Sequence, residues 1–103
     1  MAESNAHYFY VLKTKDNTLY GGYTVNPILR LKQHNQGIGA KYTRLEKRRP
    51  VAMVHLELFE TRSQAMKAEY AFKHLGSRAR KNAYLNKHSK NAQMLLSHIF
   101  KDG

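Results

Sequence analysis

HYFYVLKTKDNTLYGGYT, residues 7–24, is the stretch of sequence that decides the fold of this chain. Aromatic and branched side chains recur in alternation along 7–14 and again along 18–24, a pattern typical of β-strands. The tripeptide Lys15-Asp16-Asn17 separates the two runs and supplies turn-forming residues. The stretch therefore predicts a β-hairpin near the start of the chain.

A helix and a third strand are predicted to follow the hairpin. Asn26 fits a helix N-cap, Pro27 fits the first helical position, and Gly37 marks a C-terminal stop about ten residues later. The run VAMVHLELFE at 51–60 is short, apolar and partly alternating, which predicts a strand. Because it is the most continuous apolar segment, we expect this strand at the centre of the sheet.

The second half of the chain is predicted to be mostly helical. Thr61 or Ser63 can cap a long amphipathic helix that ends at Gly76, and Ser77 can cap a shorter helix that runs to Leu85. NAQMLLSHIF, near the end, has enough apolar residues for a last helical turn or two. The order of elements is strand, strand, helix, strand, helix, helix.

This order predicts an α+β fold, in which a small three-stranded antiparallel-type sheet is flanked by helices. At 103 residues the chain is long enough for one modest core but not for two. We expect one domain over residues 7–85 and a C-terminal tail over residues 86–103.

The charge of the chain indicates the class of its partner. Lys and Arg total 18 against 7 acidic residues, a formal net charge of +11. Such a charge attracts polyanions and raises the rate of encounter with them, so nucleic acid is the favoured partner. Charge alone does not separate a nuclease from a ribosomal protein, a chromatin-like binder or a basic peripheral membrane protein.

Several classes of protein are excluded by what the sequence lacks. There is no cysteine, which excludes disulfides, zinc fingers and thiol nucleophiles. No run approaches the roughly 18 apolar residues of a transmembrane helix, and MAESNAHYFYVL has no basic region before an apolar stretch. We expect a soluble, cytoplasmic protein with no membrane partner; a protein partner is not indicated.

Two tyrosine motifs give the chain a resemblance to the GIY-YIG nuclease family. Tyr8-Phe9-Tyr10 lies on the first predicted strand and Tyr20-Gly21-Gly22 on the second, with Arg30 and His34 on the next helix and Glu69 on the long helix. The resemblance covers about residues 7–85. GAKYTR, RRPV and TRSQAMKAEY look most like small stand-alone bacterial members, the UPF0213-like proteins.

The resemblance implies a GIY-YIG fold and a catalytic role for each of five residues. Glu69 would be the sole protein ligand of a divalent metal ion, Mg²⁺ or Mn²⁺, which suits a hard cation that keeps several waters. Arg30 would grip the scissile phosphate. Tyr20 would act as general base, either as a phenolate favoured by a nearby cation or by passing its proton to His34, and Tyr10 would position water or phosphate.

The spacing of these residues makes such a cluster geometrically credible. Tyr10 and Tyr20 can meet on one face of the hairpin, and Arg30 and His34 lie one helical turn apart. Glu69 flanks the apolar stripe of its helix, which would place its carboxylate near the sheet. The other five histidines have no metal-ligand spacing with one another, and we interpret them as structural or surface residues.

A basic segment and two further positions complete the candidate nucleic-acid site. Residues 37–50 have no strong period and are interpreted as an exposed basic loop that contacts the substrate, with Tyr42 as a ring for stacking on bases. Tyr23 stands where some relatives carry a lysine near the phosphate, and Asn82 loosely matches an asparagine that some members use. The predicted nucleic-acid contacts are Lys41, Tyr42, Arg44, Lys47, Arg48 and Arg49.

The sequence therefore favours a metal-dependent DNA endonuclease or exonuclease. The resemblance to stand-alone members implies single-stranded, branched or damaged DNA as the substrate, and the absence of a recognition domain argues against a long specific target site. Two alternatives remain open. One is a basic nucleic-acid-binding module with this fold and no catalysis, and the other is a ribosome-associated or other structural basic protein.

Overall fold

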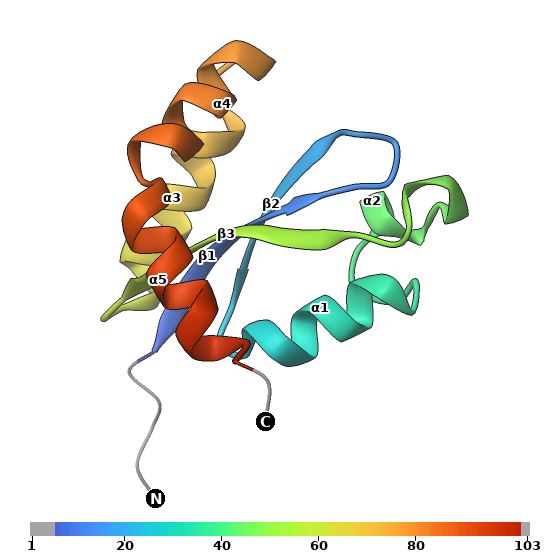
Figure 1. The fold of residues 1–103 in the computed structure, drawn as a ribbon, viewed down its shortest axis with the longest axis horizontal. Helices are drawn as coiled ribbons and strands as arrows, with labels where there is room; N and C mark the ends of the chain where they lie inside the picture. The colour runs from blue at the N-terminus through green and yellow to red at the C-terminus, as the bar shows by residue number, and fades with distance from the viewer. Residues whose placement is uncertain (1–5, 102–103) are drawn as a thin grey trace, which may run out of the picture.

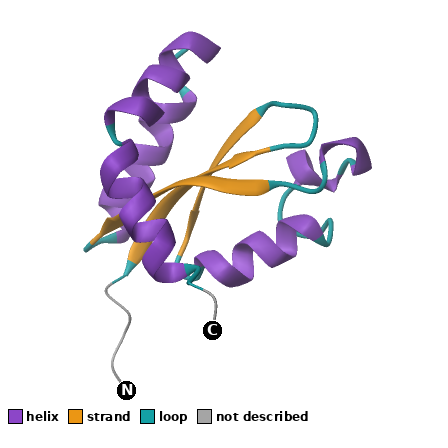
Figure 2. Cartoon of the chain, viewed as in Figure 1, coloured by secondary structure: helices purple, strands orange, loops and turns teal. Residues whose placement is uncertain are grey.

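The computed structural model describes residues 6–101 as a three-stranded sheet with helices packed on both faces (Figures 1 and 2). This confirms the predicted α+β fold. The elements, in chain order, are β1 His7–Lys13, β2 Leu19–Thr24, α1 Pro27–Asn35, α2 Lys41–Arg44, the 3₁₀ turn η1 Glu46–Arg48, β3 Ala52–Phe59, α3 Arg62–Lys73, α4 Arg78–Lys87 and α5 Ser89–Ile99.

The sheet has the strand order β2-β1-β3, and both pairs of strands are antiparallel. The expectation that the strand near 51–60 is central is therefore wrong, because β3 lies at an edge and β1 lies in the middle. The burial of the strands explains the difference. All five residues from 8 to 12 in β1 are buried, whereas Ala52 and Leu58 of β3 are exposed.

The predicted hairpin is confirmed as β1 and β2. Asn17 adopts φ 66° in the turn between them, a left-handed conformation that asparagine tolerates better than most residues. In the resulting register Tyr10 faces Gly22 and Leu12 faces Tyr20. Tyr10 and Tyr20 are thus diagonal neighbours on the same face of the sheet, as predicted.

Each of the three predicted N-caps is present. The Asn26 side chain accepts a hydrogen bond from the Leu29 amide at 3.1 Å, with Pro27 as the first residue of α1. Thr61 forms a capping box with Gln64 at the start of α3. Ser77 caps α4 by accepting a hydrogen bond from the Arg80 amide. These caps satisfy amide donors that would otherwise lack helical partners.

Alternating side chains of β1 divide the core into two layers. Tyr8, Tyr10 and Leu12 point to one face, where they pack with Leu56 and with side chains of α1 and α5. Phe9 and Val11 point to the other face, where they pack with Phe72 of α3 and with side chains of α4. The catalytic candidates Tyr10 and Tyr20 therefore project toward the layer that contains α1.

Helix α5 extends the core beyond Leu85, where the predicted domain ended. Ala92 is buried, and Leu95, Leu96 and Ile99 pack against the cluster around Tyr10 and Leu12.

Among the described residues, no helix is both long and apolar enough to cross a membrane.

Residues 37–50 are more ordered than the exposed loop that the sequence predicted. They contain α2 and η1, and Thr43 is completely buried. Tyr42, Arg48 and Arg49 are half-buried. The prediction failed because each helical turn is only three or four residues long, too short to show a hydrophobic period.

Candidate active site

A buried hydrogen bond joins the central strand to α1. The hydroxyl group of Tyr10 lies 2.7 Å from Nε2 of His34, and both side chains are almost completely buried. The other ring nitrogen of His34, Nδ1, lies 2.7 Å from the hydroxyl oxygen of Thr43 in α2. His34 is therefore held from both sides, by the sheet and by the segment after α1.

The direction of these hydrogen bonds follows from Thr43. Its hydroxyl group donates to the Ala40 carbonyl at 3.3 Å, so its oxygen accepts the proton of His34 Nδ1. A neutral imidazole protonated at Nδ1 has Nε2 free to accept, and Nε2 takes the proton of the Tyr10 hydroxyl. The chain of donors thus runs from Tyr10 through His34 and Thr43 to Ala40.

Burial favours the neutral forms of both rings. It lowers the pKa of His34 to about 4, and the nearby positive charge of Arg30 acts in the same direction. Burial also raises the pKa of Tyr10 far above its usual range, helped by the proximity of Tyr20 and Glu69 and opposed by Arg30. At neutral pH, Tyr10 is a phenol and His34 is an uncharged imidazole.

Two glycines make room for this pair. The phenol of Tyr10 crosses the backbone of Gly22 so closely that a Cβ there would overlap it. A Cβ at Gly39 would come within 2.7 Å of Cγ and Nδ1 of His34. Because neither glycine has a side chain, the Tyr10 hydroxyl can reach across β2 toward α1.

Tyr20 belongs to a stack that reaches into the basic segment. Its ring lies 5.4 Å from the ring of Tyr42 at 23°, and the Arg48 guanidinium lies 3.8 Å from the centre of the Tyr42 ring. The Tyr42 hydroxyl donates to Thr18 Oγ1 at 2.7 Å, and Arg48 pairs with Asp16 at 3.5 Å. The stack holds the Tyr20 ring in place. We expected the Tyr42 ring to stack on bases, but in the structure it already contacts Tyr20 and Arg48.

Arg30 and Glu69 approach the same tyrosines from two different helices. Arg30 is half-buried on α1, close enough to Tyr10 and His34 for its charge to affect both pKa values. Glu69 on α3 has 16% of its side chain exposed and lies close enough to Tyr10 to raise the pKa of that phenol. The structure thus brings together all five residues that the sequence singled out.

Lys73 joins this group from α3, one turn after Glu69. Its Nζ lies 3.0 Å from Glu69 Oε2 and 5.3 Å from the centre of the Tyr20 ring. Its spacing of four residues from Glu69 is one at which opposite charges on a helix pair.

The donors at this site fit a divalent cation that has one protein ligand. Within residues 6–101, no three His, Cys, Asp or Glu side chains lie close enough to share a metal ion. Glu69 is the carboxylate beside the two tyrosines, and it is partly open to solvent. A single carboxylate with an open side suits Mg²⁺ or Mn²⁺, which retain waters and accept phosphate oxygens.

The remaining basic residues of the predicted interface divide into two groups. Lys41, Arg44 and Lys47 are exposed. The guanidinium of Arg48 donates to the Tyr42 carbonyl at 3.1 Å, and that of Arg49 donates to the Arg44 carbonyl at 3.2 Å. Lys41, Arg44 and Lys47 are thus open to a ligand, whereas Arg48 and Arg49 also form hydrogen bonds within the segment.

Tyr23 and Asn82 have contacts of a different kind. The Tyr23 hydroxyl lies 2.8 Å from Nδ1 of His7, and the Arg62 guanidinium lies 5.5 Å from the centre of the Tyr23 ring. Asn82 lies on α4, where its Oδ1 accepts from Arg78 Nε at 3.2 Å. Neither residue has a described hydrogen bond to the group around Tyr10.

Sequence reasoning missed Thr43, Gly22 and Gly39 as parts of the site. Gly22 could have been found, because a glycine facing Tyr10 across a hairpin leaves space for a large ring. Thr43 carried no such indication, because its contact with His34 depends on the path of residues 37–43.

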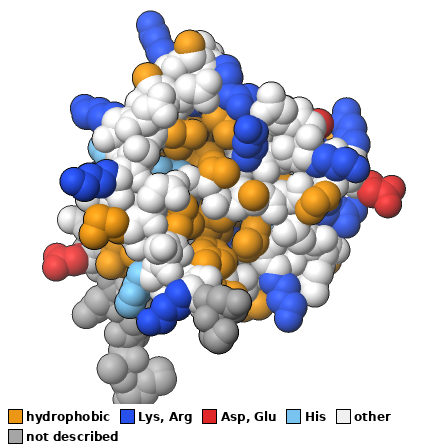
Figure 3. Space-filling model, in the orientation of Figure 1, with side chains coloured by type: hydrophobic (Ala, Val, Ile, Leu, Met, Phe, Trp, Pro, Cys, Tyr) orange, Lys and Arg blue, Asp and Glu red, His pale blue; other side chains and the backbone are white. Residues whose placement is uncertain are grey.

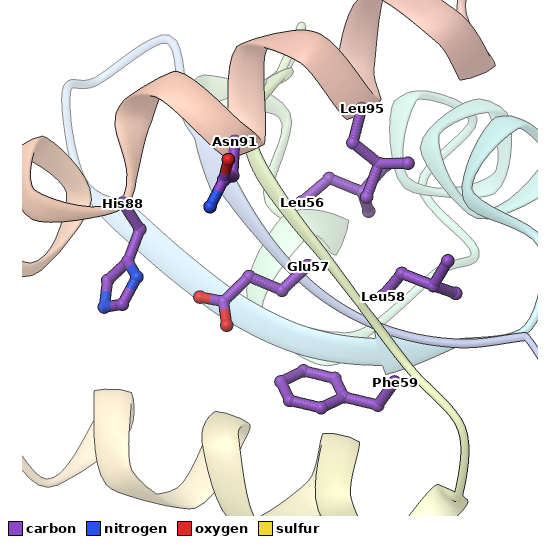
Figure 4. Close-up of a pocket in the computed structure, with 7 residues that line it drawn as sticks. All are labelled: Leu56, Glu57, Leu58, Phe59, His88, Asn91 and Leu95. Carbon is purple, nitrogen blue, oxygen red and sulfur yellow. The ribbon is translucent and has the colours of Figure 1, made fainter.

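A separate cavity of about 280 Å³ lies at the opposite edge of the sheet, along β3 (Figure 4). Glu57 points toward it between His88 and Phe59. The Glu57 carboxylate accepts hydrogen bonds from Tyr84 and from His55. Although burial opposes it, these bonds hold the Glu57 pKa below its usual range. The network ties α4 to β3 and shares none of its residues with the site around Tyr10.

In the view of Figure 3, Lys and Arg side chains are scattered around an apolar area, and acidic side chains are sparse. This distribution agrees with the net charge of +11. It provides a field that attracts a polyanion to the molecule.

The sequence of the chain is similar to those of known proteins from one family. Residues 6–84 match the family model of the GIY-YIG catalytic domain. The chain is 60% identical over 85 residues to a UPF0213 protein of Enterococcus faecalis, covering 82% of this chain and 96% of that protein. It is 52% identical to a UPF0213 protein of Listeria innocua, covering 90% of this chain and all of the relative.

A solved structure agrees with the fold. The solution NMR structure of an Enterococcus faecalis protein, EF2693, superposes with a TM-score of 0.55 at 55% identity. The match covers 85% of this chain and 92% of that protein.

Proposed function

The chain belongs to the GIY-YIG family, and we propose that it is a metal-dependent nuclease that hydrolyses phosphodiester bonds in DNA. Family membership suggests nuclease chemistry and binding of nucleic acid. The observation that carries the proposal is the convergence of Tyr20, Arg30, His34 and Glu69 around the hydroxyl group of Tyr10.

Of the two tyrosines, Tyr20 is the better candidate for the general base. Tyr10 is held as a phenol because burial raises its pKa and its proton is donated to His34. Tyr20 is only half-buried, and Lys73 lies near its ring. A tyrosine that is partly open to solvent can meet the attacking water, as a general base must.

His34 is better suited to positioning Tyr10 than to receiving a proton from Tyr20. Its ring lies 5.5 Å from that of Tyr20, centre to centre, but both of its nitrogens are engaged, one by Tyr10 and one by Thr43. The low pKa of His34 also makes it a weak acceptor. We therefore replace the proton transfer expected from the sequence with a role in fixing the Tyr10 hydroxyl.

Arg30 is the candidate for binding the scissile phosphate. Its guanidinium is permanently charged and can donate two hydrogen bonds to phosphate oxygens in parallel. It lies near both Tyr10 and His34, so a phosphate bound there would be within the same group of side chains. Negative charge that develops on the phosphoryl oxygens would be stabilised at that position.

Glu69 is the candidate ligand for Mg²⁺ or Mn²⁺. A bound cation would supply Lewis-acid stabilisation of the phosphate and of the leaving oxygen. Glu69 offers one carboxylate at the rim of the site, and the ion pair with Lys73 holds that carboxylate in place. Lys73 must release one carboxylate oxygen if that oxygen becomes the ligand.

Single-stranded, branched or damaged DNA is the proposed substrate. The exposed side chains of Lys41, Arg44 and Lys47 lie in the segment whose Tyr42 stacks on Tyr20, so a backbone bound there would lead toward the site. Contacts of this kind bind phosphates without reading a sequence. The proposal therefore includes affinity that falls with salt and little sequence preference.

A cleavage assay on labelled single-stranded, duplex and branched DNA tests this function. We expect cutting with Mg²⁺ or Mn²⁺, none with EDTA, and loss of cutting in the Glu69→Ala variant. Glu46→Ala is a matched control, because Glu46 is an exposed carboxylate in η1. Salt-sensitive binding without cutting on any substrate would instead support a basic nucleic-acid-binding module.

A further inference from the structure

Tyr70 presents its ring to solvent immediately after Glu69 on α3. All seven tyrosines lie among the described residues, and Tyr70 is the one whose exposure, 64%, places it on the open surface. Leaving a large aromatic ring exposed to water is less favourable than burying it. It follows Glu69, the proposed metal ligand, directly in the chain.

The Tyr70 ring is held in a fixed orientation by His74. The two rings stack with their centres 3.9 Å apart at 23°. His74 Nδ1 donates to the Tyr70 carbonyl at 2.8 Å, which fixes the imidazole against the helix. The pair is a pre-organised flat surface, so a ligand that stacks on it loses little side-chain entropy on binding.

The charge around this pair suits a nucleic acid. Helix α3 carries Arg62, Lys67 and Lys73, whereas Glu69 is its one acidic residue and is paired with Lys73. Lys73 lies one residue before His74 and also approaches the Tyr20 ring. Tyr70 leaves α3 about 100° around the helix axis from Glu69. A strand whose phosphate meets Glu69 and continues around α3 would therefore bring a neighbouring nucleotide toward Tyr70.

We propose that Tyr70 and His74 form a stacking platform for an unpaired nucleobase next to the scissile phosphate. A base inside a duplex has both faces covered by its neighbours, whereas a single-stranded base offers a free face to an aromatic ring. The platform thus selects substrates that have unpaired nucleotides beside the cut. This inference rests on the proposed nuclease function, since it concerns the same site.

Fluorescence can test stacking directly, because the chain contains no tryptophan. The Tyr70→Trp protein carries one indole at the platform, and stacking of a base should quench it. The probe is a short thymidine oligonucleotide, compared with a blunt duplex, in EDTA so that metal-dependent cutting does not occur. Met94→Trp is the matched control, since Met94 on α5 is 65% exposed.

We expect the thymidine oligonucleotide to quench Tyr70→Trp strongly and Met94→Trp weakly, with little quenching by the duplex. Tyr70→Ala should weaken binding of the oligonucleotide by about tenfold, and Tyr70→Phe should retain it. Met94→Ala should bind as the wild type does.

Equal affinity of Tyr70→Ala and the wild type for the oligonucleotide would overturn the platform, as would equal quenching by the duplex. Self-association that Tyr70→Ala abolishes would also overturn it, by assigning this face to a second copy of the chain. The two proposals fail separately. Quenching without cleavage on any substrate would refute the nuclease and keep the platform, and cleavage without quenching would do the reverse.

Discussion

The Tyr10 hydroxyl donates to Nε2 of His34 across 2.7 Å in the interior of the protein. This bond connects the central strand to α1, the helix that also carries Arg30. The proposed phosphate ligand is therefore held relative to the sheet by a residue one helical turn away. Tyr20, on the edge strand, completes the arrangement from the same face of the sheet.

The two tyrosines should respond differently to loss of their hydroxyl groups. Tyr20→Phe should lower the single-turnover cleavage rate by about 10²- to 10⁴-fold, as expected for removal of a general base, and leave stability nearly unchanged. Tyr10→Phe should reduce the free energy of unfolding by about 1–3 kcal/mol, because Nε2 of His34 loses its buried donor. Urea denaturation and cleavage kinetics measure both effects. A larger loss of rate in Tyr10→Phe than in Tyr20→Phe would contradict the assignment.

Gly22 and Gly21 are neighbours on β2 that face opposite layers of the core. In Gly22→Ala the new methyl group would overlap the Tyr10 phenol, so the ring must move and the cleavage rate should fall about 100-fold. In Gly21→Ala the methyl group would meet Phe72 at 3.2 Å and Phe9 at 3.3 Å, away from the site. That control should lose about 1 kcal/mol of stability and keep its rate. Equal rates in the two variants would show that the position of Tyr10 is unimportant.

Stability should fall at acidic pH because of His34. Its pKa is about 4 in the folded protein, against 6.5 for a histidine in an unfolded chain, so the unfolded chain binds the extra proton first. The neutral His34 ring makes its full contribution to the free energy of unfolding above about pH 6.5, and this contribution is lost as the pH falls toward 4. At 1.36 kcal/mol per pH unit the loss amounts to about 3 kcal/mol.

Urea denaturation of the wild type and of His34→Gln from pH 7.5 to 4 would measure this loss. The difference between their free energies of unfolding should shrink by about that amount over the interval. A difference that stays constant with pH would mean that His34 titrates normally.

Lys73 should compete with a divalent cation for Glu69. Removing its charge in Lys73→Met frees the carboxylate, so Mn²⁺ affinity should rise about two- to fivefold, the range expected for an exposed ion pair. Paramagnetic resonance of free Mn²⁺ measures this affinity without any cleavage. Lys67→Met is the control, since Lys67 is an exposed lysine on the same helix. Equal tightening in both variants would indicate only a general effect of net charge.

The parts of the fold that the sequence predicted well have strong local causes. The hairpin follows from alternation around a short turn, and α1, α3 and α4 begin at Asn26, Thr61 and Ser77, whose side chains cap them. The order of strands has no such local cause. It depends on contacts between distant parts of the chain, and one of these is the packing of α5, which looked like a tail, on the core cluster that includes Leu56 of β3.

The candidate site, like the fold, could be predicted from the sequence only in part. Tyr10, Tyr20, Arg30, His34 and Glu69 could be selected from motifs and spacing, and the structure places them together. Their chemical states could not be predicted. The low pKa of His34 depends on burial beneath residues 39–43, and the ring of Tyr42 is occupied by Tyr20 and Arg48.

The most direct test of the nuclease proposal is the single-turnover rate at which Glu69→Gln cuts a labelled single-stranded oligonucleotide in Mg²⁺. The measurement is made beside the wild type and Glu46→Gln, at a protein concentration that binds all of the DNA. The account predicts that Glu69→Gln binds the DNA, keeps the thermal stability of the wild type and cuts at least about 10³-fold more slowly, as expected if it loses the metal ion that stabilises the transition state. Cutting by Glu69→Gln at the rate of Glu46→Gln would contradict it.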